Sequence, residues 1–171
     1  VNPVLREGNS DRRVAASVKQ YARKHPHSMG KWSKDSKSHV SSMGGGDFYA
    51  TEQSVVVAKG GKLKIELTNN RGEKTVLKES VSVKDGDVVA ASSMNRRALR
   101  DFYAKQIAEA KSKGLLLSLH LKATMMKVSD PIMFGHAVEV YYQDVLQKHA
   151  DTLKKLGFEP NNGIGDLYTK I

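Results

Sequence analysis

Lys122 follows a part of the sequence that is typical of ligand sites. A leucine-rich run over residues 115–121 begins after Gly114 and predicts a strand covered on both faces. Asp130-Pro131 then predicts the start of a helix, with Asp130 as its N-cap. In open α/β sheets, ligands sit in the crevice beyond the carboxyl ends of the strands. Lys122 is therefore a candidate site residue, and the alternative is a lysine that only ends a strand in solvent.

A second group of candidates lies in the first thirteen residues. Asn2, Arg6, Arg12 and Arg13 are close together in this segment. Each guanidinium presents a planar fork of donors that matches a carboxylate or a phosphate. Several converging arginines suit a ligand with two or three carboxylates. The alternative is a solvated basic loop whose arginines pair with neighbouring acidic residues.

Other motifs in the sequence predict no site. His25 and His27 flank a proline, but no nearby carboxylate completes a metal site. The Gly163-x-Gly165 pattern lacks the third glycine of a dinucleotide fingerprint. The chain has no cysteine, which excludes disulfides, a thiol nucleophile and a zinc–thiolate site. These patterns therefore give no more than a weak signal for a metal or dinucleotide site.

Helices are expected in three places. Residues 14–24 predict a short helix that ends at His25-Pro26. Residues 95–113 and 131–156 have apolar side chains at helical spacing and end at glycines, and the second stretch is one long helix or two joined ones.

Strands are expected between residues 48 and 94, where apolar and polar residues alternate. Turn signals at residues 69–72 and 84–87 separate the runs. We predict an antiparallel β-meander of three or four half-buried strands. With the buried strand at residues 115–121 and the flanking helices, the expected fold class is α/β, in the sense of mixed α and β.

The chain is basic, with a net charge of +10. Residues 1–40 hold 9 Lys and Arg against 3 Asp and Glu, whereas residues 41–171 hold 19 against 15. This excess calls for a polyanionic partner or a multiply charged acidic ligand. A nucleic-acid-binding module would usually add aromatic platforms or a known helix motif, but aromatic residues make up only 6% of the chain. Nucleic acid is therefore not the favoured partner.

Length and hydropathy place further bounds on the chain. Its 171 residues, 39% of them hydrophobic, suffice for one domain or for part of a larger one. The sequence has neither an apolar run of roughly 20 residues, as a membrane span requires, nor a leader pattern at its start. We expect no membrane association and a cytoplasmic location. Because the chain begins at Val1 and Asn2-Pro3 is typical of an interior stretch, we also expect a fragment of a longer protein.

Four stretches of the sequence resemble a known family. They are VLREGNSDRR, SVKQYARKHPHSMGKWSKDSKSHV, LHLKATMMKVSDPIMFG and NNGIGDLY. Together they resemble the monomeric-type NADP-dependent isocitrate dehydrogenases of bacteria, over nearly the whole chain. Since those enzymes are several times longer, the resemblance implies an internal segment of an isocitrate/isopropylmalate dehydrogenase-like large domain. Residues 1–13 would be a substrate-binding segment near the interdomain junction, and residues 14–171 would be part of the large domain.

The resemblance implies a role for each candidate residue. Asn2, Arg6 and Arg12 match the segment that holds the carboxylates of isocitrate, and Asn2 would also lie near the nicotinamide of NADP. Lys122 matches the catalytic lysine, which would serve in the acid–base steps, with its pKa lowered by cationic neighbours in a partly dry site. The Mg or Mn ligands, the catalytic tyrosine and most NADP contacts would lie outside this segment.

The activity implied is oxidative decarboxylation of isocitrate to 2-oxoglutarate and CO2, in the tricarboxylic acid cycle or glyoxylate bypass. The expected partners are isocitrate and the remainder of the parent enzyme. We expect the isolated segment to be inactive. A basic nucleic-acid-binding module and a non-catalytic structural domain are the alternatives.

Overall fold

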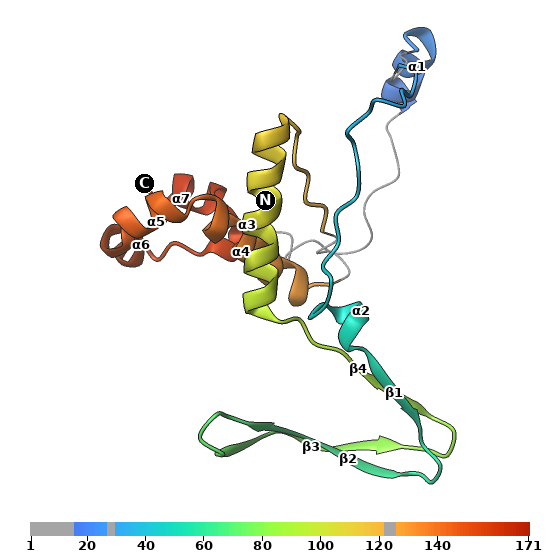
Figure 1. The fold of residues 1–171 in the computed structure, drawn as a ribbon. Coiled ribbons are helices and arrows are strands. Elements are labelled where there is room, and N and C mark those ends of the chain that lie inside the picture. Colours follow the sequence, from blue (N-terminus) through green and yellow to red (C-terminus); the bar gives the residue numbers. More distant parts are fainter. Residues whose placement is uncertain (1–15, 27–29, 122–125) are drawn as a thin grey trace. The chain divides into compact units, whose positions relative to one another are not determined.

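The computed structural model describes residues 16–26, 30–121 and 126–171, without the side chains of Val18 and Lys19. These residues form helices and antiparallel strands, which confirms the mixed α and β class (Figure 1). The chain divides into two compact units, one of residues 1–42 and 97–171 and the other of residues 43–96. The predicted division after residue 13 stays a prediction, because residues 1–15 lie outside the described part.

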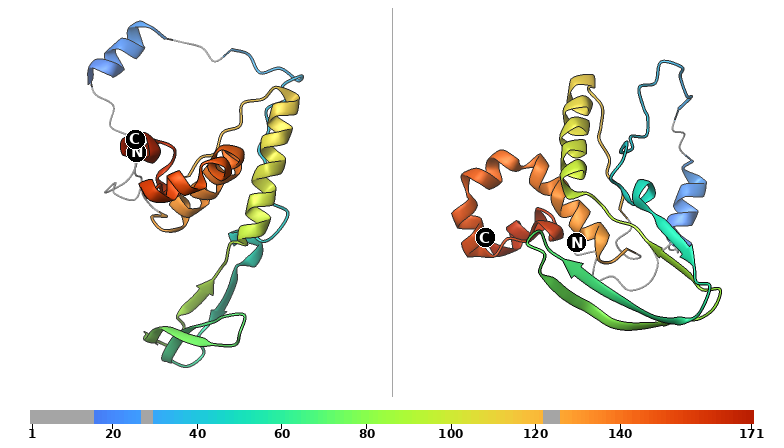
Figure 2. Two further views of the ribbon diagram at one scale, coloured as in Figure 1. Left: turned by 90° about the vertical axis from the view of Figure 1, so that its left-hand side faces the viewer. Right: turned by 60° about the horizontal axis from the view of Figure 1, so that its bottom comes forward.

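The second unit is a long two-stranded ribbon (Figures 1 and 2). Its strands are β1 (Gln53–Val56), β2 (Gly61–Thr68), β3 (Lys74–Val83) and β4 (Val88–Ala91). β2 pairs with β3, and β1 pairs with β4, both antiparallel. The ribbon is therefore a nested hairpin, and the predicted meander order is wrong. The number and direction of the strands agree with the prediction.

The corner of the ribbon explains the nested order. The N–H of Val57 donates to the carbonyl of Asp87 at 2.8 Å, and the N–H of Gly86 donates to the carbonyl of Val57 at 2.8 Å. The carboxylate of Asp85 also accepts a bond from the N–H of Gly60 at 2.5 Å. Because these bonds continue the pairing past the end of β2 and β3, β1 must meet β4.

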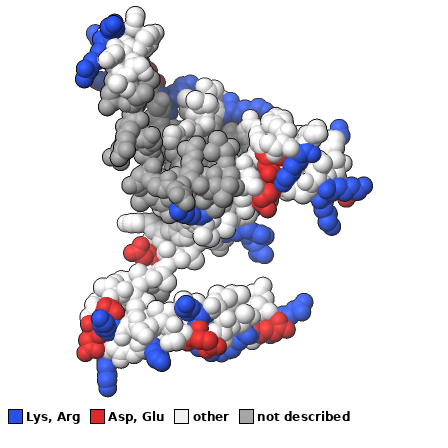
Figure 3. Space-filling view, turned by 180° about the vertical axis from the view of Figure 1, so that it is seen from behind, with Lys and Arg blue, Asp and Glu red and all other residues white. Residues whose placement is uncertain are grey.

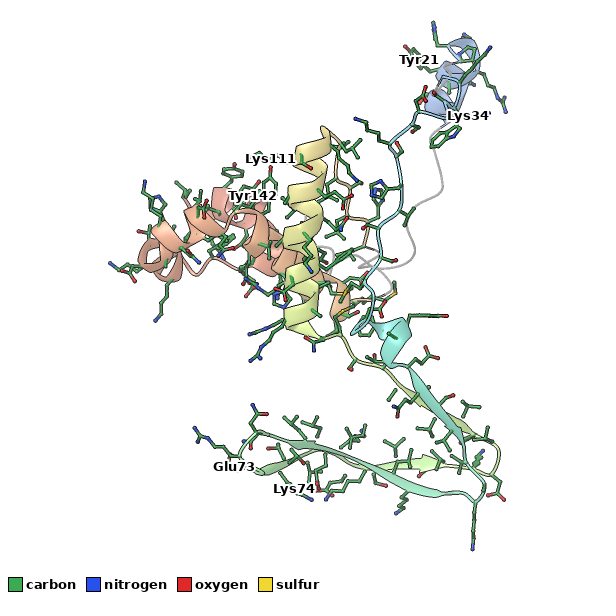
Figure 4. All side chains as sticks on the ribbon, viewed as in Figure 1. Tyr21, Lys34, Glu73, Lys74, Lys111 and Tyr142 are labelled. Carbon is green, nitrogen blue, oxygen red and sulfur yellow. The ribbon has the colours of Figure 1, made fainter. Side chains whose placement is uncertain are left out.

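Both predicted turns of the ribbon are confirmed. At the closed end, the side-chain oxygen of Asn69 accepts from the N–H groups of Arg71 and Glu73, at 2.9 and 3.0 Å. Gly72, with φ +81°, takes the left-handed conformation that such turns need. The labelled side chains of Glu73 and Lys74 mark this end of the ribbon in Figure 4.

A short helix, α2 (Phe48–Thr51), precedes the ribbon in a stretch where strand spacing was predicted. Asp47 caps it by accepting from the N–H of Ala50 at 3.0 Å. The hydroxyl of Thr51 donates to the carbonyl of Ser93 at 2.6 Å and accepts from the N–H of Ser93 at 2.9 Å. These bonds close the base of the ribbon.

The strands are more exposed than predicted. On one face, Glu66 pairs with Lys64 at 2.9 Å and Lys74 at 3.1 Å, and these ammonium groups lower the pKa of its carboxyl. Figure 3 shows charges of both signs along the ribbon. The alternating apolar residues remain open, with Ile65 at 51% and Leu67 at 53% exposure. The period-two pattern predicted the strands correctly, but no described element covers their apolar side.

The first unit is helical. Its helices are α1 (Ala16–Lys24), α3 (Arg96–Lys113), α4 (Ser129–Tyr141), α5 (Gln143–Lys148), α6 (Ala150–Leu156) and α7 (Gly165–Lys170), with a 3-10 turn, η2 (Pro160–Asn162). The buried hydrophobic side chains of the described residues are Leu99 and Tyr103 of α3 and Val138 of α4. The small core therefore involves α3 and α4.

Two of the three helix predictions hold, and the third changes. α1 and α3 match the predicted ranges within two residues. The stretch at 131–156 is broken at Tyr142 and His149, which leave helical geometry, so three helices replace one or two. Gly157, with φ +67°, caps the last of them as predicted.

α4 and η2 pack closely. A Cβ on Gly135 would lie 2.0 Å from Oδ1 of Asn161, so only glycine fits there without a shift. The 3-10 turn is held by Glu159, whose carboxylate accepts from the N–H of Asn161 at 3.1 Å. The close approach of Asn161 to Gly135 therefore holds the C-terminal stretch against α4.

The predicted buried strand at residues 115–121 is absent. The segment has no regular secondary structure, and Leu116 is 96% exposed. A strand needs a backbone partner, but in the described ranges no strand pairs with this stretch. The bond from the N–H of Leu115 to the carbonyl of Ala110 continues the end of α3 instead.

Candidate functional site

All four predicted site residues lie outside the described part of the chain. These are Asn2, Arg6, Arg12 and Lys122. The structure therefore describes what flanks Lys122, namely the stretch before it and helix α4 after it. The geometry of the first thirteen residues stays a prediction.

An apolar groove lies next to the stretch before Lys122. Its volume is about 770 Å³, and all its lining residues belong to the helical unit. Leu115, Leu117 and Leu119 line it together with residues of α3, α4 and the 38–41 segment. Ser41, in that segment, donates to the side chain of Gln106 of α3 at 2.5 Å. Tyr142, labelled in Figure 4, is another lining residue. The segment that leads to Lys122 and helix α4 thus share one groove.

Helix α4 begins differently from the prediction. Its first residue is Ser129, and the preceding Val128 makes no side-chain capping bond. Asp130 therefore lies in the first turn rather than at the N-cap, and it is only 3% exposed. The sequence signal for a helix start was right, but the burial of Asp130 was not predicted.

Tyr103 is the titratable neighbour of Asp130. This phenol on α3 is 7% exposed. Burial raises its pKa above the ordinary value, and the negative charge of Asp130 raises it further. The two groups lie in a poorly hydrated part of the α3–α4 contact.

A charged cluster joins the same two helices. Arg100 of α3 forms an ion pair with Glu139 of α4, and its Nη1 lies 3.3 Å from Nδ1 of His136. His136 also lies 3.6 Å from the carboxylate of Glu139. Sequence reasoning missed this cluster because its members are 36 and 39 residues apart. The cluster fixes α4 against α3.

The described residues do not fit a divalent metal site. Among them, no three His, Asp or Glu side chains gather as metal ligands would. The described histidine of the predicted weak pair, His25, stacks on Tyr21 with ring centroids 4.4 Å apart. Within the described ranges, no helix is long and apolar enough to cross a membrane.

Comparisons with known proteins identify relatives over the whole chain. A sequence model of the family described as monomeric isocitrate dehydrogenase matches residues 1–171. An NADP isocitrate dehydrogenase of Azotobacter vinelandii is 60% identical over 171 residues. Enzymes named NADP isocitrate dehydrogenase 2 from Colwellia maris and Mycobacterium tuberculosis are 57% and 52% identical.

These alignments cover 100% of this chain and 23% of each relative. The chain thus spans about a quarter of the length of the relatives it matches. The resemblance found in the four quoted stretches is confirmed: the chain belongs to the monomeric isocitrate dehydrogenase family.

Proposed function

We propose that this chain contributes substrate-binding and acid–base residues to an NADP-dependent isocitrate dehydrogenase. The observation that carries the proposal is the family match over residues 1–171, which includes both segments that hold the candidate residues. The reaction is the oxidative decarboxylation of isocitrate to 2-oxoglutarate and CO2. The alternative of a nucleic-acid-binding module has no support in the relatives' names.

The substrate chemistry agrees with the residue types. Isocitrate carries three carboxylates, and Arg6 and Arg12 each offer a bidentate donor pair for one of them. Asn2 can accept and donate through its amide, so it suits a polar group of the substrate beside the nicotinamide. These three residues would bind and orient isocitrate.

Lys122 would move the protons. NADP⁺, when bound by the enzyme, would accept a hydride from C2 of isocitrate, and the C2 hydroxyl would give its proton to a base; loss of CO2 from the resulting oxalosuccinate would leave an enolate. The enolate that remains is then protonated at C3. A positioned lysine can supply or accept a proton in such steps, typically accelerating them by about 10²–10⁴-fold.

The reaction also needs a divalent metal and NADP, as the family resemblance implies. The described residues form no set that fits Mg²⁺ or Mn²⁺, and the sequence has no complete dinucleotide fingerprint. As the family resemblance implies, we propose that the metal ligands and most of the NADP contacts lie on other parts of the parent enzyme. We further propose a cytoplasmic location, which suits a chain without cysteine.

The test is NADPH formation from isocitrate with Mn²⁺ present, in a chain of the relatives' full length that carries these residues. Lys122→Met is expected to lower kcat at least 100-fold while isocitrate still binds. The matched control is Lys127→Met, an exposed lysine five positions further on, which should keep its activity. Full activity of Lys122→Met would contradict the role of Lys122.

A second pair of variants tests substrate binding. Arg6→Gln and Arg12→Gln should raise KM for isocitrate, because each removes a charge-assisted carboxylate contact. Arg23→Gln, an exposed arginine of α1, is the control. The 171 residues alone should form no NADPH, and activity of this isolated chain would overturn the placement of the metal and NADP contacts elsewhere.

A further inference from the structure

The β-ribbon has an apolar row of side chains on one of its faces. Alternate residues of a strand point to the same side, so Leu63, Ile65 and Leu67 share one face of β2. Residues that lie directly opposite in an antiparallel pair also share a face, and Val81 of β3 lies opposite Leu63. Leu63, Ile65, Leu67 and Val81 therefore form a continuous apolar row.

The other face of the ribbon is charged. Glu66 pairs there with Lys64 at 2.9 Å and with Lys74 at 3.1 Å, an arrangement that suits contact with water. Lys78 lies opposite Ile65, where the register of the two strands shifts. A lysine in such a place can lay its aliphatic stem beside the apolar row and keep its ammonium group at the rim. The ribbon is thus amphipathic.

The apolar row is open in this chain. Ile65 is 51% exposed, Leu67 is 53% exposed and Val81 is 37% exposed. A two-stranded ribbon by itself is only marginally stable in water, and a further strand or a second layer on its hydrophobic face is needed for independent stability. A contiguous apolar surface of this kind marks an interaction site.

The family match indicates where the second layer comes from. The chain spans 23% of each relative, so about three quarters of the parent polypeptide lies elsewhere. The family is described as monomeric, which favours a partner from the same polypeptide over a second copy. The side chains of the apolar row have no hydrogen-bonding groups, so a polar partner would give up its bonds to water without replacement. The partner surface should therefore be apolar.

We propose that the apolar row is an intramolecular docking surface, on which an apolar layer from the remainder of the parent polypeptide packs. The proposal concerns packing rather than chemistry, so it does not depend on the proposed reaction. In the 171-residue chain the row is open, and changes to its side chains cost little stability. In the full-length enzyme the same changes become costly.

The test measures melting temperatures in the full-length enzyme. Ile65→Lys and Leu67→Lys would each place a charge beneath the apolar layer and should lower the melting temperature by about 4 °C or more. The matched control is Thr68→Lys, an exposed position of β2 opposite Lys74, which should change it by less than about 1 °C. Equal melting temperatures for Leu67→Lys and Thr68→Lys would overturn the proposal.

A second measurement needs no variant and covers the case in which the lysine variants do not fold. Hydroxyl-radical oxidation of Ile65 and Leu67, followed by mass spectrometry, is compared in the native and the urea-unfolded full-length enzyme. Side chains as open as those of the ribbon in this chain, at 51% and 53% exposure, should oxidise at about half the unfolded rate. A covered row should oxidise far more slowly than that, and rates near half would overturn the proposal.

The source of the covering layer is tested by light scattering of the natural full-length enzyme. A monomeric mass together with slow oxidation of Ile65 and Leu67 supports a layer from the same polypeptide. A dimeric mass that Leu67→Lys reduces to that of a monomer would show that a second copy covers the row, and it would overturn the intramolecular assignment.

Discussion

The helical unit and the β-ribbon are stabilised in different ways. The buried hydrophobic side chains of the described residues, Leu99, Tyr103 and Val138, all belong to the helical unit. The ribbon places none of its described side chains in the buried class. Its order comes from backbone pairing and from turns built on Asn69, Gly72 and Gly86.

The difference shows which kind of interaction determines the structure of each unit. Side-chain packing determines how α3 meets α4, so changes in side-chain volume should be costly there. Backbone geometry determines the ribbon, so changes at tight backbone contacts should be costly there, whereas side-chain truncations should be mild. Each prediction below compares a position with a matched control.

The largest effect is expected from Leu99→Ala. Leu99 is 4% exposed, and removing its buried carbons should lower the unfolding free energy of the α3–α4 region by about 2–4 kcal/mol. Leu67→Ala in the ribbon, at 53% exposure, should cost less than about 1 kcal/mol. Hydrogen exchange of the backbone amides in each unit measures both. Similar losses in the two variants would contradict the contrast between the units.

Gly135→Ala should have the next largest effect. The added Cβ would lie 2.0 Å from Oδ1 and 3.1 Å from Cα of Asn161, so α4 and η2 must move apart at a cost of about 1–3 kcal/mol. Gly165→Ala is the control, because nothing lies within 4 Å of its Cβ position. The readout is the melting temperature. An unchanged value for Gly135→Ala would show that the α4–η2 contact is looser than described.

Gly60→Ala tests the corner of the ribbon. Its Cβ would lie 2.9 Å from the carbonyl oxygen of Val83, which is backbone and cannot rotate away. We expect a loss of about 1–2 kcal/mol and faster exchange of the amides of Gly60 and Gly86. The adjacent Gly61→Ala, with open space at its Cβ, should leave exchange nearly unchanged. Equal exchange in the two variants would contradict the tight corner.

The smallest effect concerns the pH dependence of stability. Burial and the charge of Asp130 raise the pKa of Tyr103, so the folded state holds this proton more tightly than the unfolded state. The resulting stability is present below the ordinary tyrosine pKa of about 10 and is lost as pH rises through the raised value. In Tyr103→Phe, the unfolding free energy should fall less steeply between about pH 9 and 11, as measured by denaturant titration. An unchanged slope would show that Tyr103 is not the source of this pH dependence.

Local patterns in the sequence predicted the local elements well. The turn residues at 69–72 and 84–87, the glycine caps at Gly114 and Gly157, and the period of the strands all act over a few residues. Such signals depend on φ preferences and on nearest-neighbour hydrogen bonds. They do not depend on where the rest of the chain lies, so these elements can be predicted from the local sequence alone.

The same reasoning failed where the outcome depends on distant partners. Residues 115–121 have the composition of a buried strand. No strand in the described part of the chain pairs with them, so they do not form a strand. The order of the ribbon, with β1 on β4, depends on the corner bonds between Val57 and residues 86 and 87. Strand composition carries no information on such pairing.

The same distinction applies to the candidate site, of which one part was predicted from the sequence and the other was seen only in the structure. The sequence by itself predicts Asn2, Arg6, Arg12 and Lys122 as site residues, because a family's site residues lie in short motifs that can be compared letter by letter; the prediction is untested, since all four lie outside the described residues. Only the tertiary structure showed that Asp130 is buried, that Arg100 binds Glu139, and that residues 115–119 share a groove with α4. Burial and long-range pairing are properties of the folded chain, since they arise from residues that are distant in sequence and adjacent in space.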